Sequence, residues 1–118
     1  MKVHMADCLF CRIIAGDTPG AFIYQDDRIV AFKDINAQAP MHVLLVPRRH
    51  IASLNELTGD DDALVGEMTR RAAAIATDNG YADRGYRTVF NCNADAGQTV
   101  FHLHMHLLGG RKLGWPPG

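Results

Sequence analysis

The run His102-Leu103-His104-Met105-His106 constrains the fold of this chain more than any other feature. Side chains along a β-strand alternate between two faces, so the three histidines would share one face while Leu103 and Met105 point into the core. Imidazole nitrogens need hydrogen-bond partners when they are buried, so packing alone is a poor explanation for three of them together. The spacing predicts a strand over 99–108 that presents a histidine face for chemistry.

The chemistry of such a face has three possible forms. A histidine with an ordinary pKa is mostly neutral at pH 7, so a ring nitrogen can attack phosphorus, accept a proton or bind a metal. The spacing alone does not decide between them. Gly97, Gln98 and Thr99 precede the run and offer close backbone approach and side-chain donors, which suits an oxyanion or a phosphate. An ordinary hairpin turn would have a similar composition.

The remaining sequence predicts a single α+β domain over residues 1–118. Apolar spacing and turn residues predict, in chain order, a helix at 7–16, strands at 21–25, 28–33 and 42–46, a helix at 60–80, and strands at 86–92 and 99–108. Because short turns join most strands, we expect an antiparallel sheet with the helices on one side. Residues 1–6 are expected to be flexible, and residues 111–118 form a C-terminal tail.

Charge and cysteine content exclude several classes of protein. The chain has 12 Lys and Arg against 13 Asp and Glu, a net charge of −1, which gives no electrostatic basis for binding nucleic acid or an anionic membrane. No segment is apolar enough for a membrane span or a signal peptide, so a cytoplasmic location is expected. Three cysteines argue against a disulfide framework, so Cys8 and Cys11 are better interpreted as thiols or metal ligands.

The histidine run, with the apolar Leu107 and Leu108 after it, resembles the signature of the histidine triad (HIT) family. The similarity extends from about Cys8 to the last residue, and its other segments are Asp34-Ile35, Pro40-Met41-His42, Pro47 with His50, Asn91, Gly97-Gln98-Thr99 and Trp115-Pro116-Pro117-Gly118. The terminal segment resembles the Hint branch, nucleotide-binding proteins that hydrolyse purine nucleoside phosphoramidates. The resemblance implies the HIT fold, a five-stranded sheet with two helices, joined to a second subunit as a ten-stranded sheet.

The resemblance also implies roles for individual residues. His104 would attack the α-phosphorus and form a covalent nucleotidyl-histidine, from which water releases a nucleoside monophosphate. His42 and His106 would flank it and hydrogen-bond phosphate oxygens. Thr99 takes the place of a serine that is common in Hint proteins and would contact the leaving group. The remaining phosphate contacts would be Asn91, Gly97 and Gln98.

The nucleoside would bind beside these residues. Asp34 resembles the carboxylate that accepts from the two ribose hydroxyls, although by itself it could be an exposed turn residue. Phe10, Ile13 and Ile35 occupy the positions of the apolar walls of a purine pocket, and they could equally be plain core. In Hint proteins the tail with Trp115 crosses the homodimer and lines the partner's leaving-group side, so we expect the same here, against the alternative of a disordered end.

A second cluster of candidate ligands consists of Cys8, Cys11, His50 and His102. Two cysteines and two histidines suit a structural, tetrahedral zinc ion, and many bacterial HIT proteins have a similar site. Reduced thiols packed beside two histidines remain the alternative, and Cys92 is expected in the core. Two other functions also stay open: a dinucleoside polyphosphate hydrolase, and a nucleotide-binding regulator with negligible turnover.

Overall fold

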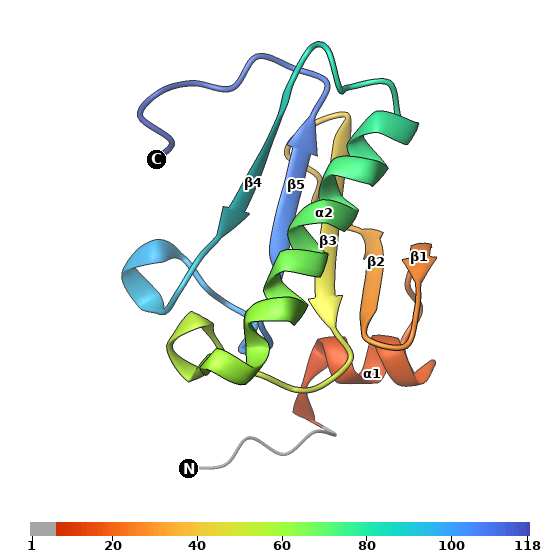
Figure 1. The fold of residues 1–118 in the computed structure, drawn as a ribbon, viewed down its shortest axis with the longest axis vertical. Helices are drawn as coiled ribbons and strands as arrows, with labels where there is room; N and C mark the ends of the chain where they lie inside the picture. The colour runs from red at the N-terminus through yellow and green to blue at the C-terminus, as the bar shows by residue number, and fades with distance from the viewer. Residues whose placement is uncertain (1–6) are drawn as a thin grey trace.

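The computed structural model describes residues 7–118 and contains one antiparallel sheet of five strands with two α-helices (Figure 1). The strand order is β1-β2-β3-β5-β4, so β5 lies between β3 and the edge strand β4. The elements are α1 (Leu9–Ala15), β1 (Phe22–Gln25), β2 (Ile29–Lys33), β3 (Met41–Pro47), α2 (Asp62–Asp78), β4 (Tyr86–Phe90) and β5 (Met105–Gly109). The predicted α+β class, with its five-stranded antiparallel sheet and two helices, is confirmed.

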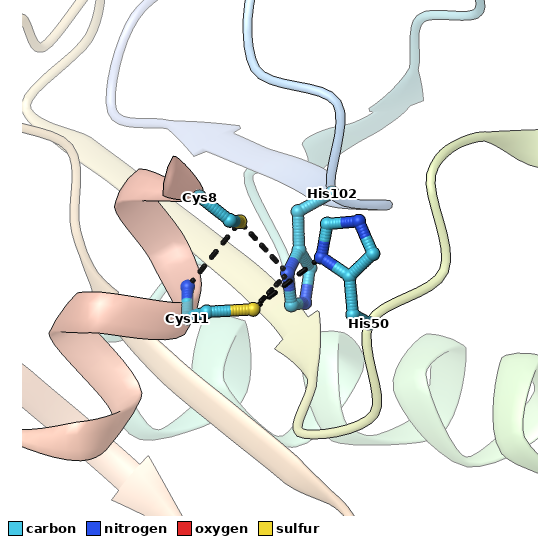
Figure 2. A group of neighbouring side chains, drawn as sticks. All are labelled: Cys8, Cys11, His50 and His102. Atoms are coloured by element: carbon cyan, nitrogen blue, oxygen red, sulfur yellow. Dashed lines mark hydrogen bonds between the residues drawn. The ribbon is translucent and has the colours of Figure 1, made fainter. Parts of the chain in front are cut away.

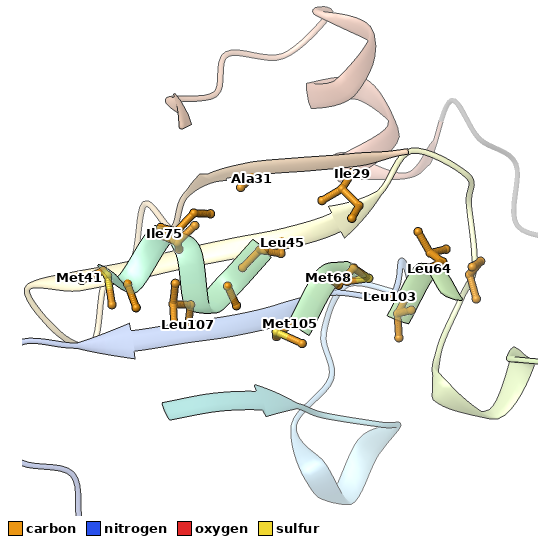
Figure 3. Packing of buried hydrophobic residues seen from close by; sticks show 14 residues of the cluster. Ile29, Ala31, Met41, Leu45, Leu64, Met68, Ile75, Leu103, Met105 and Leu107 are labelled. Atoms are coloured by element: carbon orange, nitrogen blue, oxygen red, sulfur yellow. The ribbon is translucent and has the colours of Figure 1, made fainter. Parts of the chain in front are cut away.

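The two helices cover opposite faces of the sheet, which differs from the expectation that both lie on one side. The helix α2 packs Leu64, Met68 and Ile75 against one face, in a cluster that includes Leu45 and Met105 (Figure 3). The helix α1 packs on the other face, where the buried residues are Phe10, Ile13, Val30, Phe32, Leu44 and Val46. Strand β3 is therefore buried along its whole length. Sequence order alone does not reveal which face each helix takes.

The start of α2 has a local explanation. The 3₁₀ turn Gly59–Asp61 leads directly into α2 and is closed by a capping box: the side chain of Asp61 accepts from the Thr58 N–H, and the Thr58 hydroxyl accepts from the Asp60 N–H. The helix begins at Asp62 and is followed by Asn79 and Gly80, whose φ of 83° suits glycine. The predicted helix at 60–80 is therefore confirmed within two residues at each end.

The strand predicted over 99–108 begins only at Met105. Its neighbour β4 ends at Phe90, which pairs with Met105, so the residues before Met105 have no strand beside them on that side. The Leu103 N–H instead donates to the Ile51 carbonyl. The alternation of side chains nevertheless continues through this segment, because Leu103, Met105 and Leu107 all belong to the core beneath α2.

The structure does not test the predicted flexibility of residues 1–6 or the predicted cytoplasmic location. Residues 1–6, predicted to be flexible, lie outside the described residues. No helix in the described part of the chain is long and apolar enough to cross a membrane. The cytoplasmic location stays a prediction.

Candidate active site

Three histidines meet on the face of the sheet opposite α2. His42 lies near the start of β3 and His106 lies in β5, the neighbouring strand, where His106 pairs with Leu44. The His42 Nε2 atom lies 2.9 Å from His106 Nδ1. His104 precedes β5, and its ring centre lies 5.0 Å from that of His106. The predicted histidine face therefore exists, although only His106 of the triplet lies within a strand.

The hydrogen bonds of His104 assign its tautomer. Its Nδ1 lies 2.8 Å from the carbonyl oxygen of His102. A carbonyl can only accept, so His104 Nδ1 carries a proton and donates it. In the neutral ring the lone pair is then on Nε2, the atom suited to act as a nucleophile or a base. The ring of Phe10 packs edge-on against this imidazole at 5.1 Å between centres.

The hydrogen bonds of His42 assign its tautomer in the same way. His42 Nδ1 accepts from the Gln38 backbone N–H at 3.0 Å, so its proton is on Nε2. That Nε2 faces two acceptors, His106 Nδ1 at 2.9 Å and Asp34 Oδ2 at 3.3 Å. His106 accepts on Nδ1 and, when neutral, carries its own proton on Nε2.

Burial keeps this pair of imidazoles uncharged. Desolvation lowers the pKa of His42 from its ordinary value, and the carboxylate of Asp34 opposes that change. Desolvation, followed by repulsion from His104 and His42, lowers the pKa of His106 to about 4. Both rings are therefore neutral near pH 7. This agrees with a single hydrogen bond between them, in which His42 Nε2 donates to His106 Nδ1.

These histidines open onto a cavity of about 490 Å³, which we call the histidine cavity. Its volume lies in the range of pockets that bind small ligands. Its apolar lining includes Phe10, Ile13, Leu44 and Val100. Its polar lining consists of Asp34, His42, Thr99, His104 and His106, together with Thr18, Lys33, Asn36 and Gln38.

Most of the predicted site residues line the histidine cavity. Phe10 and Ile13 are both core residues and cavity walls, so the two interpretations of them hold together. Ile35 lies at the rim with a fully exposed side chain (102%). The residues of the predicted phosphate site that do not line the cavity are Asn91, Gly97 and Gln98. The Gln98 side chain is buried in the loop and bonded to backbone groups.

Sequence reasoning missed several cavity residues. Leu44 follows His42 by two positions on β3, so strand alternation could have placed it on the same face. Val100, next to Thr99, had a similar signal. The segment Thr18-Pro19-Gly20, between α1 and β1, also lines the cavity, and it follows no periodic pattern that could have indicated this.

The second predicted cluster is also assembled by the fold (Figure 2). Cys8 is the N-cap of α1, and Cys11 lies in the first turn, where its N–H donates to the Cys8 sulfur. His50 follows β3 and His102 precedes β5. The Cys8 Sγ atom lies 3.4 Å from His102 Nδ1, and the Cys11 Sγ atom lies 3.3 Å from His50 Nδ1. The four candidate ligand atoms all lie within 4.8 Å of one another.

The geometry of this cluster fits a tetrahedral zinc ion. With Zn–S near 2.3 Å and Zn–N near 2.0 Å, a tetrahedron separates sulfur from nitrogen by about 3.5 Å. His102 Nε2 donates to the Pro47 carbonyl at 2.7 Å, which leaves the Nδ1 lone pair directed at the thiols. Burial and the neighbouring Cys8 raise the pKa of Cys11 to about 11, which keeps its thiol protonated. A bound cation would lower this pKa and favour the thiolate.

Comparison with known proteins agrees with this architecture. The family model described as "Scavenger mRNA decapping enzyme C-term binding" matches residues 7–113. The chain is 48% identical over 112 residues to an uncharacterized HIT-like protein of Synechocystis, covering 95% of this chain and 97% of that one. It is 44% identical over 108 residues to the purine nucleoside phosphoramidase of Escherichia coli K12, covering 92% and 91%.

A solved structure gives the same result. The HIT family hydrolase from Legionella pneumophila Philadelphia 1 has a TM-score of 0.93 and 46% identity, covering 95% of this chain and all of that chain (100%). The family model matches residues 7–113, and these relatives each match more than nine-tenths of the chain. The chain therefore belongs to the histidine triad family of hydrolases.

Proposed function

We propose that this protein hydrolyses purine nucleoside 5′-phosphoramidates and releases a nucleoside monophosphate and an amine. The observation that carries the proposal is the tautomer of His104, whose Nδ1 proton is held by the His102 carbonyl so that Nε2 keeps its lone pair beside the neutral His42–His106 pair. The relative from Escherichia coli named as a purine nucleoside phosphoramidase supports the choice of substrate.

The histidine cavity has a place for each part of such a substrate. The apolar wall with Phe10 and Leu44 suits a purine base, which offers a large flat surface. The carboxylate of Asp34 lines the same cavity, 3.3 Å from His42 Nε2, and suits the ribose hydroxyls. The α-phosphate then lies next to His104, with the hydroxyl of Thr99 on the same cavity.

The proposed reaction has two displacement steps. The Nε2 lone pair of His104 attacks the α-phosphorus, a P–N bond forms to the histidine, and the P–N bond to the substrate amine breaks. The departing amine takes up a proton, for which His106 Nε2–H and the Thr99 hydroxyl are the nearby donors. Water then attacks the same phosphorus and returns a proton to the group that protonated the amine. The P–N bond to His104 breaks with its electron pair going back to Nε2, and the monophosphate is released.

We also propose that Cys8, Cys11, His50 and His102 hold one zinc ion. When bound, zinc would connect the start of α1 to the segment after β3 and the segment before β5. It would have no open position for substrate, because all four ligands come from the protein. The sulfur–nitrogen distances of 3.3 to 3.5 Å support this proposal.

Turnover measurements test the proposed substrate class. Purified protein is incubated with adenosine 5′-phosphoramidate, and the release of AMP is followed beside a parallel reaction with a diadenosine polyphosphate. We expect a clearly higher kcat/KM for the phosphoramidate. Faster hydrolysis of the polyphosphate would instead support the dinucleoside polyphosphate hydrolase, and AMP binding without turnover of either substrate would support the regulatory protein.

The role of Asp34 can be tested with a conservative change. The variant Asp34→Asn is expected to raise KM by about tenfold or more with a smaller change in kcat, because ribose contacts alter little during the displacement. The wild type should have a higher KM for a substrate that lacks the ribose 2′-hydroxyl. The KM of the variant should change little when this hydroxyl is removed. Asp27→Asn, an exposed carboxylate outside the cavity, is the matched control. A large loss of kcat with an unchanged KM would contradict the ribose assignment.

The next prediction is that the protein forms a homodimer, and it is based on the exposed edge of strand β4. Among residues 7–118, strand β4 pairs with β5 alone, which leaves its outer edge available to a second copy of the chain. We propose a C₂ homodimer of about 26 kDa, twice the 13.0 kDa of one chain, whose sheets join into ten strands. Light scattering at micromolar concentration measures the mass directly, and a monomer there would contradict the dimer.

The tail can be tested separately from the dimer. Trp115 is 85% exposed, and the preceding Gly114 carbonyl accepts from Arg87 of β4, so the tail runs beside the open edge. We propose that in the dimer Trp115 lies near the partner's cavity. Deletion of residues 113–118 is expected to change the preference between small and bulky amine leaving groups while thermal stability changes little. An unchanged preference would contradict the role of the tail even if the dimer forms.

A further inference from the structure

The loop that leads to the histidine cavity contains an unfavourable backbone conformation. Among residues 7–118, Asn93 is the one non-glycine residue with a positive φ. Its φ of 65° and ψ of −170° lie in a region that glycine occupies readily and other residues avoid. Asn93 comes three residues after the end of β4, at the point where the chain leaves the sheet. Such a conformation persists only when neighbouring groups hold it.

The side chain of Gln98 holds this residue in place. The Asn93 N–H donates to Gln98 Oε1 at 2.9 Å, and the Gln98 N–H donates back to the Asn93 carbonyl at 3.1 Å. The Gln98 Nε2 group donates to the Ala52 carbonyl at 2.9 Å and to the Val100 carbonyl at 3.1 Å. Gln98 is only 5% exposed, and its side-chain oxygen and both amide protons are used.

These bonds connect three separate parts of the chain. One is the strained residue Asn93 after β4, the second is the segment after β3 at Ala52, and the third is the stretch that enters the histidine cavity. Thr99 and Val100 follow Gln98 directly, and both line the cavity, while Gln98 itself does not. Loss of the Gln98 amide would free Asn93 to relax, and the residues that follow would move with it.

We propose that Gln98 is a positioning residue: its amide holds Asn93 in a backbone conformation that asparagine avoids and thereby places Thr99 against the reacting phosphate. The role of Thr99 in this inference rests on the proposed phosphoramidase function. Gln98 makes no contact with substrate in this arrangement, so its side chain acts through the loop.

Three variants separate this role from a direct phosphate contact: Gln98→Ala, Asn93→Gly and the double variant. We expect Gln98→Ala to lower kcat about tenfold while KM changes less than threefold, because nucleoside contacts are untouched. Asn93→Gly alone should keep kcat within twofold, since glycine adopts the same φ without strain. The double variant should recover at least threefold over Gln98→Ala. A double variant no more active than Gln98→Ala would overturn the proposal.

A second measurement needs no turnover. Amide hydrogen exchange of the substrate-free protein should show the Asn93 N–H protected in the wild type and in Thr99→Ala, and unprotected in Gln98→Ala. Equal protection in Gln98→Ala would overturn the proposed hold on Asn93. If the wild type hydrolyses no phosphoramidate, the proposed function fails, yet this exchange result still decides whether Gln98 holds the loop.

Thermal melting covers the case in which Gln98→Ala does not fold. With Gln98 intact, Asn93→Gly should melt no lower than the wild type, and Asn93→Ala should melt lower, because alanine tolerates a positive φ less well than asparagine does. Asn93→Gly melting below Asn93→Ala would show that no strain is held there and would overturn the proposal.

Discussion

Replacing His104 with alanine is expected to lower kcat by about 10⁴-fold or more, the size of loss seen when a covalent nucleophile is removed. The reason is the geometry of its ring: with Nδ1 donating to the His102 carbonyl, the lone pair of the neutral ring is on Nε2, and His104 lines the histidine cavity. No neighbouring side chain can take over its position, because His42 and His106 bond to each other. Steady-state release of AMP from adenosine 5′-phosphoramidate measures the loss.

A trapping experiment assigns the loss to the nucleophile. Acid quenching of the wild type during turnover should leave a nucleotidyl group on the protein, detectable by intact mass. His104→Ala should show none of this adduct, whereas His106→Ala, the matched control, should still form it more slowly. A His104→Ala variant that keeps half of the wild-type kcat would contradict the assignment, and so would an adduct that survives in that variant.

Loss of the proposed zinc ion is expected to be the largest change in stability. Protein purified without added metal should contain about one zinc per chain, and Cys8→Ser should contain far less. Since the ion binds the folded state preferentially, its loss should lower the melting temperature by at least about 10 °C. Elemental analysis and thermal melting of the same samples make the test.

The choice of Cys8→Ser removes one ambiguity. Cys8 also caps α1 by accepting from the Cys11 N–H, and serine is itself a good N-cap, so the cap survives while the metal ligand is lost. Cys92→Ser is the control, because Cys92 is a free, half-buried cysteine outside the Cys8–Cys11–His50–His102 cluster. Zinc absent from the wild type, or equal melting of the wild type and Cys8→Ser, would end the zinc proposal.

Features set by local periodicity were predictable from the sequence. Alternation in the histidine run correctly separated its histidines from Leu103 and Met105, which lie in the core beneath α2. Helical spacing placed both helices within two residues. The chemistry of the run, by contrast, stayed open until the resemblance to the HIT family was considered, because a row of histidines suits metal binding as well as catalysis.

Features set by distant segments were not predictable. The last strand, β5, starts at Met105 because β4 stops at Phe90, and nothing in the sequence before Met105 indicates this boundary. Gln98 was predicted to contact phosphate, yet its side chain bonds to Asn93 and Ala52 from two other segments. Periodicity indicates which way a side chain points from its own helix or strand. It does not indicate which carbonyl of a distant segment will accept a hydrogen bond from that side chain.

The position of His42 on β3 and of His106 on β5 has a consequence for how the protein opens. These two strands lie at the centre of the sheet, and β3 is buried on both sides, so they belong to the unit that separates only when the whole domain unfolds. The His42–His106 pair should therefore keep its geometry through every smaller fluctuation. Any opening of the histidine cavity then falls to residues outside the strands, such as the exposed Ile35, while the loop that carries Thr99 is held by Gln98.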